Sequence, residues 1–271
     1  MHIDVLGSVT VITYGEERTI GSNKTRALLS ALTVEAGHAI SLDTLADELW
    51  SGRPPRNSRN ALQAHATRLR KVLDGPGCAP GASRLRAMRN GYLLDVARES
   101  VDANRFLDLA ADGAAALHTD PARALELLRA ALQLWRGPAL LDAGDGLRCR
   151  AAAALFEERR LTAWEDLATA RLALNDEGNA IAELTRLVAQ HPRRERFCEQ
   201  LMLALYRTGR QSEALELFQL TRQRLDRDLG IEPGLPLKRR HAEILAQAPE
   251  LTLQSAVWSH QRGRGPLTAT G

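Results

Sequence analysis

Apolar side chains alternate with polar ones at the start of the chain. Ile3, Val5, Val9 and Val11 occupy odd positions, with an interruption at Gly7 and Ser8. This period of two predicts a β-strand over residues 2–12. A second short strand over residues 18–20 is expected to pair with it across the polar turn formed by residues 14–17.

Three segments with helical spacing follow. The first starts near Lys24 after a cap at Ser22 or Asn23, and it ends at Gly37. The second spans residues 42–49 after a cap at Ser41. A turn rich in proline and glycine at residues 51–56 separates it from the third, which spans residues 58–73.

Residues 84–96 predict a β-hairpin, because the Asn90-Gly91 step is a strong short-range hairpin signal. The order of strands, three helices and a hairpin is that of a winged helix-turn-helix, in which the second and third helices form the helix-turn-helix and the hairpin forms the wing. Residues 1–97 are therefore expected to form an α+β winged-helix domain that folds alone and binds duplex DNA.

After about residue 98 the strand signals stop and only helical spacing remains. The predicted helices span residues 102–117, 121–135, 149–174, 179–190, 195–208, 212–229 and 237–246. Pro121 and Pro192 suit the first turn of a helix. The Gly178-Asn179 step and the Gly209-Arg210 step lead into similar apolar patterns, which indicates tetratricopeptide-like stacking.

The predicted fold is mainly α: an N-terminal winged helix-turn-helix followed by an all-α, tetratricopeptide-like helical domain over residues 98–247. Leu201, Leu205, Ala214, Leu217 and Phe218 are the expected seam between stacked helices. Residues 248–271 lose periodicity and predict a disordered tail.

Charge is distributed unevenly along the chain. The total is +3, but residues 53–89 contain nine basic side chains and one acidic side chain, Asp74. That window therefore carries +8 and the rest of the chain −5. A basic segment on a mildly acidic body is typical of a nucleic-acid-binding protein, although an arginine-rich solvated face has the same charge.

The third predicted helix falls in this basic window and has two distinct faces. Leu62, Ala66, Leu69 and Leu73 form the stripe expected to be buried. The opposite face has amide, hydroxyl and basic side chains and no acidic residue, which suits base contacts in the major groove and contacts to phosphates. A stable cationic helix that binds no nucleic acid is the alternative. The residues predicted to contact DNA are Arg59, Asn60, Gln63, Ala64, His65, Thr67, Arg68, Arg70 and Lys71 on the helix and Arg89 and Asn90 on the wing.

His65 lies at the edge of the buried stripe and is expected to pack or to bind a phosphate rather than a metal, because no Cys or His lies at ligand spacing. Asp142 and Asp145 form part of a glycine-rich loop that lacks the remaining acidic positions of a calcium-binding loop, so a solvated loop is expected. No cofactor or metal is predicted.

Composition excludes several other classes. Hydrophobic residues make up 44% of the 271 positions and charged residues 25%, which is typical of a folded domain. No apolar run is long enough to span a membrane, and no signal peptide is recognisable, so a cytoplasmic protein is expected. Three scattered cysteines argue against a disulfide framework. No catalytic motif is visible, so an enzyme is not expected.

Longer motifs carry a resemblance to a known family. NALQAHATRLRKVL (residues 60–73) and GYLLDV (residues 91–96) resemble the recognition helix and wing of OmpR-type domains, a likeness that response-regulator effectors share. Three further segments resemble the bacterial transcriptional activator domain: LWRGPAL (134–140), HPRRERFCEQLMLALYRTGRQSEAL (191–215) and LDRDLGIEPGLPL (225–237). Together they resemble the Streptomyces antibiotic regulatory proteins, in a short form without an ATPase module. Arg193 and the segment LPLKRRHAEIL depart from the family pattern.

The resemblance implies a transcriptional activator of an antibiotic pathway. Such a protein would bind direct repeats near the −35 element of a promoter, as a homodimer on DNA, and would recruit RNA polymerase holoenzyme through its sigma factor and alpha subunit. The alternative is a helical-repeat adaptor that uses its winged helix for protein contacts. A steep loss of DNA affinity with salt would separate the two.

Overall fold

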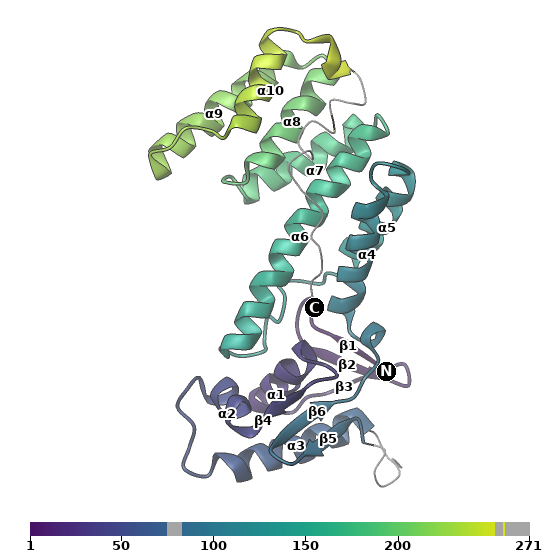
Figure 1. Ribbon diagram of the computed structural model, residues 1–271, viewed down its shortest axis with the longest axis vertical. Coiled ribbons are helices and arrows are strands. Elements are labelled where there is room, and N and C mark those ends of the chain that lie inside the picture. Colours follow the sequence, from purple (N-terminus) through teal and green to yellow (C-terminus); the bar gives the residue numbers. More distant parts are fainter. Residues whose placement is uncertain (75–82, 253–256, 258–271) are drawn as a thin grey trace. The chain divides into compact units, whose positions relative to one another are not determined.

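The computed structural model describes residues 1–74, 83–252 and 257, and its contacts divide the chain into two compact units (Figure 1). The first comprises residues 1–112 and 129–163, and the second comprises residues 113–128 and 164–271. The predicted boundary between residues 97 and 98 lies inside the first unit, so an independent domain ending there remains a prediction. Most of the predicted tail lies outside the described residues, but residues 249–252 form a short 3-10 helix, η2 (Pro249–Thr252).

The N-terminal sheet differs from the single strand expected over residues 2–12. The chain turns back on itself, so that β1 (His2–Asp4) pairs antiparallel with β2 (Thr10–Thr13), and β2 pairs with β3 (Glu16–Arg18). The expectation was wrong because the amides between these strands bond elsewhere: Asp102 accepts the N–H groups of Val5 and Leu6, and Asp142 accepts that of Val9.

The three N-terminal helices confirm the helix-turn-helix. Ser22 caps α1 (Asn23–Val34), and its hydroxyl accepts the N–H of Thr25. Ser41 caps α2 (Leu42–Trp50) in the same way, and its hydroxyl accepts the N–H of Thr44. These caps satisfy amides that the helices cannot pair internally. The third helix, α3 (Ser58–Asp74), buries the four residues of the predicted stripe.

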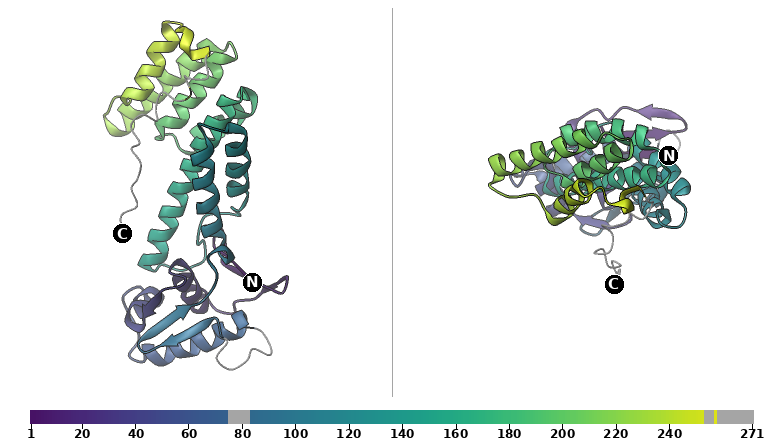
Figure 2. Two further views of the ribbon diagram at one scale, coloured as in Figure 1. Left: turned by 45° about the vertical axis from the view of Figure 1, so that its right-hand side comes forward. Right: turned by 90° about the horizontal axis from the view of Figure 1, so that it is seen from above.

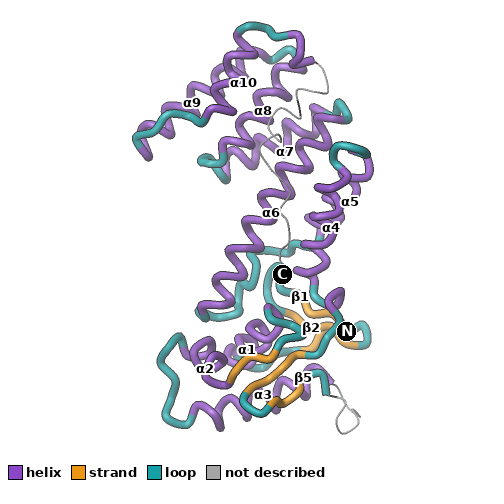
Figure 3. Tube along the Cα trace, viewed as in Figure 1, coloured by secondary structure: helices purple, strands orange, loops and turns teal. Residues whose placement is uncertain are grey.

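The wing belongs to a three-stranded sheet with the order β4-β6-β5; the strands are labelled in Figure 1 and drawn in orange in Figure 3. Its hairpin joins β5 (Leu85–Met88) and β6 (Gly91–Leu94) through a turn at Arg89 and Asn90. Strand β4 (Ala39–Ser41) was not predicted. A Cβ atom at Gly91 would lie 2.1 Å from the carbonyl oxygen of Ile40, so glycine is required there by the approach of β4.

Carboxylates join the winged helix to later residues of the same unit. Asp102, at the start of α4 (Asp102–Ala116), is 5% exposed and accepts N–H groups of Val5 and Leu6 at 2.7 and 3.0 Å. Glu48 of α2 accepts the N–H groups of Arg148 and Cys149 at the start of α6 (Leu147–Ala173). A negative charge at a helix N-terminus is favourable, since the free amides and the helix dipole both attract it. The first unit therefore extends beyond the winged helix itself.

The second unit is built from stacked helices, and the predicted ranges agree with α7 to α10 within two residues. It contains α7 (Glu177–Gln190), α8 (Glu195–Arg207), α9 (Gln211–Leu229) and α10 (Leu235–Leu245). Helix α8 packs against α7, α9 and α10, and the green and yellow helices in Figure 2 show this stack. Pro192 lies three residues before α8 rather than in its first turn.

Three helices carry residues of both units: α4, α5 (Pro121–Gln133) and α6. Helix α5 begins at Pro121 as expected, and α6 continues through residue 163. Of the expected seam, Leu201, Leu205, Ala214 and Phe218 are buried, and Leu217 is half-buried.

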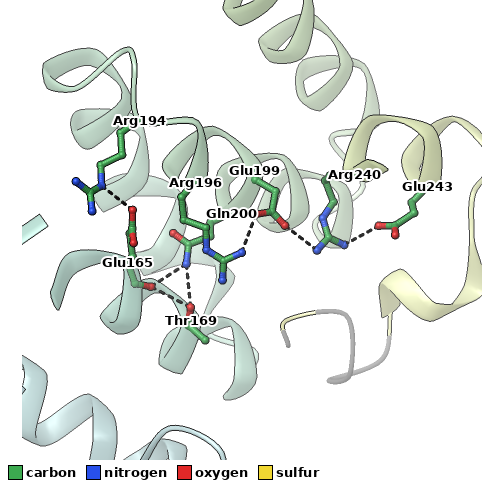
Figure 4. Close-up of polar contacts among 8 residues, drawn as sticks. All are labelled: Glu165, Thr169, Arg194, Arg196, Glu199, Gln200, Arg240 and Glu243. Carbon is green, nitrogen blue, oxygen red and sulfur yellow. Dashed lines mark hydrogen bonds and ion pairs between the residues drawn. The ribbon is translucent and has the colours of Figure 1, made fainter. Parts of the chain in front are cut away.

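A buried polar network accompanies the apolar seam of the second unit (Figure 4). The Gln200 amide donates to the carbonyl oxygen of Glu165 and to the Thr169 hydroxyl, at 2.7 and 2.9 Å. Glu199 is 2% exposed, and its carboxylate accepts from both Arg196 and Arg240. Buried charges that are paired and hydrogen-bonded fix one arrangement of the helices that carry them.

The contact of Asp102 predicts a stability effect. Asp102→Ala should lower the free energy of unfolding by about 1–3 kcal/mol for each amide left without an acceptor. The matched control on the same helix is Asp108→Ala, which breaks an exposed ion pair with Arg98 and should cost at most about 1 kcal/mol. Urea unfolding followed by circular dichroism measures both, and equal losses would contradict the role given to Asp102.

The helical seam yields a second prediction. Leu205→Asp places a carboxylate where the side chain is 5% exposed, so it should cost several kcal/mol of stability or force protonation of the new carboxyl group. Leu220→Asp makes the same change at a position that is 53% exposed and should shift stability by no more than about 0.5 kcal/mol. Thermal unfolding of the two full-length variants compares them directly.

Candidate nucleic-acid interface

The exposed side of α3 presents side chains suited to base contacts. Asn60, Gln63, Ala64 and Thr67 are all exposed, and they recur at the spacing that places residues on one helix face. The Thr67 hydroxyl donates to the carbonyl oxygen of Gln63 at 2.9 Å, which leaves its oxygen lone pairs available to accept. The face is therefore polar, with the small Ala64 side chain allowing close approach.

Four cations surround this face without acidic partners. Arg59, Arg68 and Lys71 on α3 and Arg89 at the turn of the wing are exposed, and no carboxylate within the described ranges lies within 4 Å of any of them. Elsewhere arginines are commonly paired, as in the exposed pairs Arg222–Glu232 and Arg210–Glu213. Unpaired positive charge on one helix and the adjacent hairpin forms a surface that attracts polyanions.

The single acidic residue of α3 is used within the unit. Asp74 accepts the N–H of Arg84 at 3.0 Å, at the point where the chain enters β5. The Arg84 guanidinium donates to the carbonyl oxygen of Leu73 at 2.9 Å. Both contacts connect the end of α3 with the wing, so the Asp74 carboxylate binds a backbone amide there rather than a cation of the exposed face.

Arg70 differs from the other predicted DNA contacts because its side chain bridges α3 and the wing. Its Nε donates to the carbonyl oxygen of Leu85 at 3.1 Å, and its guanidinium carbon lies 5.7 Å from the ring centroid of Tyr92. Arg86 is likewise paired, with Asp95. Arg70 therefore positions the hairpin against α3, and its contact with DNA remains a prediction.

His65 lies between the buried stripe and the exposed face of α3. Its Nδ1 is 3.0 Å from the Thr25 hydroxyl oxygen, which is 2.8 Å from the Ser22 hydroxyl oxygen. Partial burial lowers the pKa of His65, and the positive charges of Arg68 and Lys24 lower it further, so the ring is neutral at physiological pH. Among the described residues there is no cluster of side chains that could hold a metal ion.

Several residues that shape this interface were not singled out from the sequence. The sequence predicts a cap at Ser22 or Asn23, and the structure has Ser22 in that role. The contact of Thr25 with His65 spans 40 residues, so no local pattern indicates it. The role of Glu48 depends on its contact with Arg148, and that of Gly91 on the approach of Ile40, so both follow from contacts between residues distant in the sequence. The Cys149 thiol beside Glu48 is unsuited to chemistry, because burial and that carboxylate raise its pKa to about 12. In the described part of the chain no helix has both the length and the apolar character needed to span a membrane.

Comparison with known families covers both halves of the chain. Residues 16–94 match the family described as "Transcriptional regulatory protein, C terminal", and residues 101–245 match the "Bacterial transcriptional activator domain".

Similar individual proteins are transcriptional regulators by name. The transcriptional regulator RedD of Streptomyces coelicolor is 55% identical over 95% of this chain and 74% of its own length. The regulatory protein DnrI of Streptomyces peucetius is 35% identical over 92% of this chain and 93% of its own. A solved structure of Mycobacterium tuberculosis EmbR in complex with a low-affinity phosphopeptide has a TM-score of 0.87 and 31% identity, and the match covers 94% of this chain and 69% of that one. With its OmpR-type winged helix and its activator domain, this chain belongs to the Streptomyces antibiotic regulatory protein family of transcriptional regulators.

Proposed function

We propose that this protein is a sequence-specific, DNA-binding activator of transcription, and that α3 enters the major groove. The exposed face of α3 carries the proposal: amide, hydroxyl and small side chains lie at its centre, and four cations without acidic partners lie around it. Amide side chains contact base edges, while arginine and lysine side chains contact phosphates. The turn of the wing, whose residues Arg89 and Asn90 are exposed, contacts the adjacent minor groove.

The finer features of the proposal come from the family. The protein binds direct repeats near the −35 element as a homodimer on DNA, and it recruits RNA polymerase holoenzyme through the sigma factor and the alpha subunit. Its targets are promoters of a pathway for antibiotic biosynthesis, and it acts in the cytoplasm. The rigid stack of α7 to α10 supports this proposal because it offers a fixed surface for protein contacts.

The decisive experiment selects binding sites from a pool of random duplexes with the full-length protein. Enriched sequences should contain a repeated motif, and affinity for them should fall linearly with the logarithm of salt concentration. Absence of enrichment combined with salt-independent, weak binding would favour the adaptor alternative. Transcription from a promoter that carries the selected repeats upstream of its −35 element then measures activation by Streptomyces RNA polymerase.

Two substitutions on α3 should have different effects on DNA binding: one on sequence discrimination and the other on overall affinity. Gln63→Ala removes a base contact and should reduce discrimination between selected and random DNA by about 1–3 kcal/mol. Lys71→Ala removes a phosphate contact, so it should weaken binding to both and flatten the salt slope by about one unit. The control Arg222→Ala removes one positive charge from α9, and it should leave binding unchanged. Equal losses on both DNAs for Gln63→Ala would show that the base-contacting face has been misassigned.

A further inference from the structure

The hydroxyls of Ser22 and Thr25 connect the start of α1 to the recognition helix α3. The Thr25 side chain is 2% exposed, and its hydroxyl lies within hydrogen-bond distance of two groups: the Ser22 hydroxyl at 2.8 Å and the His65 Nδ1 at 3.0 Å. Ser22 also accepts the N–H of Thr25 as the cap of α1. The three side chains therefore form one chain of hydrogen bonds that ends on the histidine ring.

Hydrogen bonds can run along this chain in either direction, and each direction leaves one proton without an acceptor within the described residues. If Ser22 donates to Thr25, and Thr25 donates to Nδ1, each hydroxyl proton has an acceptor. In the reverse direction Nδ1 donates to Thr25 and Thr25 donates to Ser22, so the Ser22 proton has no partner within the described residues and Nε2 carries no proton. The first arrangement leaves Nδ1 without a proton. Because the ring is neutral, its remaining proton is then on Nε2.

The Nε2 atom has no hydrogen-bond partner in the described part of the chain, and the His65 side chain is partly exposed. His65 lies on the flank of α3 that also carries Arg68, whereas Arg70 lies on the flank that faces the wing. The charged groups around the ring are Lys24 at the start of α1 and Arg68 on α3, and both are cations. An anionic acceptor would therefore be attracted to this side of the helix.

We propose that His65 donates a hydrogen bond from Nε2 to a phosphate oxygen of the DNA backbone, and that Ser22 and Thr25 are positioning residues that hold the ring in the required tautomer and orientation. This inference rests on the proposed function and deepens it, because it names the donor atom of His65 and the two residues that set its tautomer. A neutral donor on a backbone phosphate fixes the register of α3 in the groove without adding a charge.

Two substitutions of His65 separate the two sides of the ring. The Asn side chain has a polar atom near the position of Nδ1 but lacks a donor at the position of Nε2. The Gln side chain places an amide N–H near the position of Nε2. His65→Asn should therefore weaken binding of the full-length protein about ten-fold, to both a selected and a random duplex. His65→Gln should stay within about two-fold of the unsubstituted protein. Neither should change the salt slope, in contrast to Lys71→Ala, because a neutral donor displaces no counterion.

A second pair tests the positioning residues. Thr25→Val removes the hydroxyl with little change of shape, and it should weaken binding several-fold. Thr25→Ser keeps the hydroxyl and should restore most of the affinity. Circular dichroism melting of all four variants shows whether each is folded at the temperature of the binding measurement.

Replacement of single phosphates by neutral methylphosphonates distinguishes contact from packing. A methylphosphonate at the phosphate that His65 contacts should lower the affinity of the unsubstituted protein and of His65→Gln. The same methylphosphonate should not lower the affinity of His65→Asn further, because that variant has already lost the contact. If the loss caused by the methylphosphonate adds to the loss caused by His65→Asn at every phosphate, the inference is overturned, since His65 then acts through packing alone. Unchanged binding by His65→Asn would also overturn it. If the unsubstituted protein binds no duplex, the proposed function fails and this inference fails with it.

Discussion

Backbone amides that secondary structure leaves unpaired are satisfied by carboxylates far away in the sequence, and the first unit depends on this constraint. Asp102 accepts two amides of residues that follow β1, and Glu48 accepts two amides at the start of α6. Each pair joins segments about a hundred residues apart. Because a buried amide without an acceptor is costly, these contacts fix which segments can pack together.

The position of the candidate DNA-binding face depends on the packing that these contacts fix. Helix α3 buries one stripe against α1, α2 and the sheets, so its opposite face is determined by packing. Glu48 lies on α2, the first helix of the helix-turn-helix, and a Cβ at Gly146 would lie 2.0 Å from its carboxylate. Residues 146–149 therefore fit closely against the helix-turn-helix. A winged helix cut at residue 97 would lose the partners of Val5, Leu6 and Glu48.

Local patterns in the sequence predicted most of the helices, the two serine caps and the hairpin, because periodicity and capping are properties of neighbouring residues. Strand β4 could not be predicted, since three residues without alternation become a strand only by pairing with β6. The fold of the first twelve residues into a hairpin depends on Asp102 and Asp142, which no local pattern indicates. In the interface, the exposed positions of α3 follow from helical spacing alone. The use of Arg70 against the wing and of Thr25 against His65 follows from tertiary packing.

The central claim, that the exposed face of α3 enters the major groove, is tested most directly by cleavage of DNA from a tethered iron chelate. The chelate is attached to a cysteine introduced by Ala64→Cys in the full-length protein, after Cys78 has been replaced; Cys149 and Cys198 are buried. A matched variant, Glu16→Cys, carries the chelate on β3, in the other sheet of the same unit (Figure 1). The account predicts cleavage from position 64 at the selected site, with the strand offset typical of the major groove, and none from position 16. Equal cleavage from both positions, or a minor-groove offset from position 64, would contradict it.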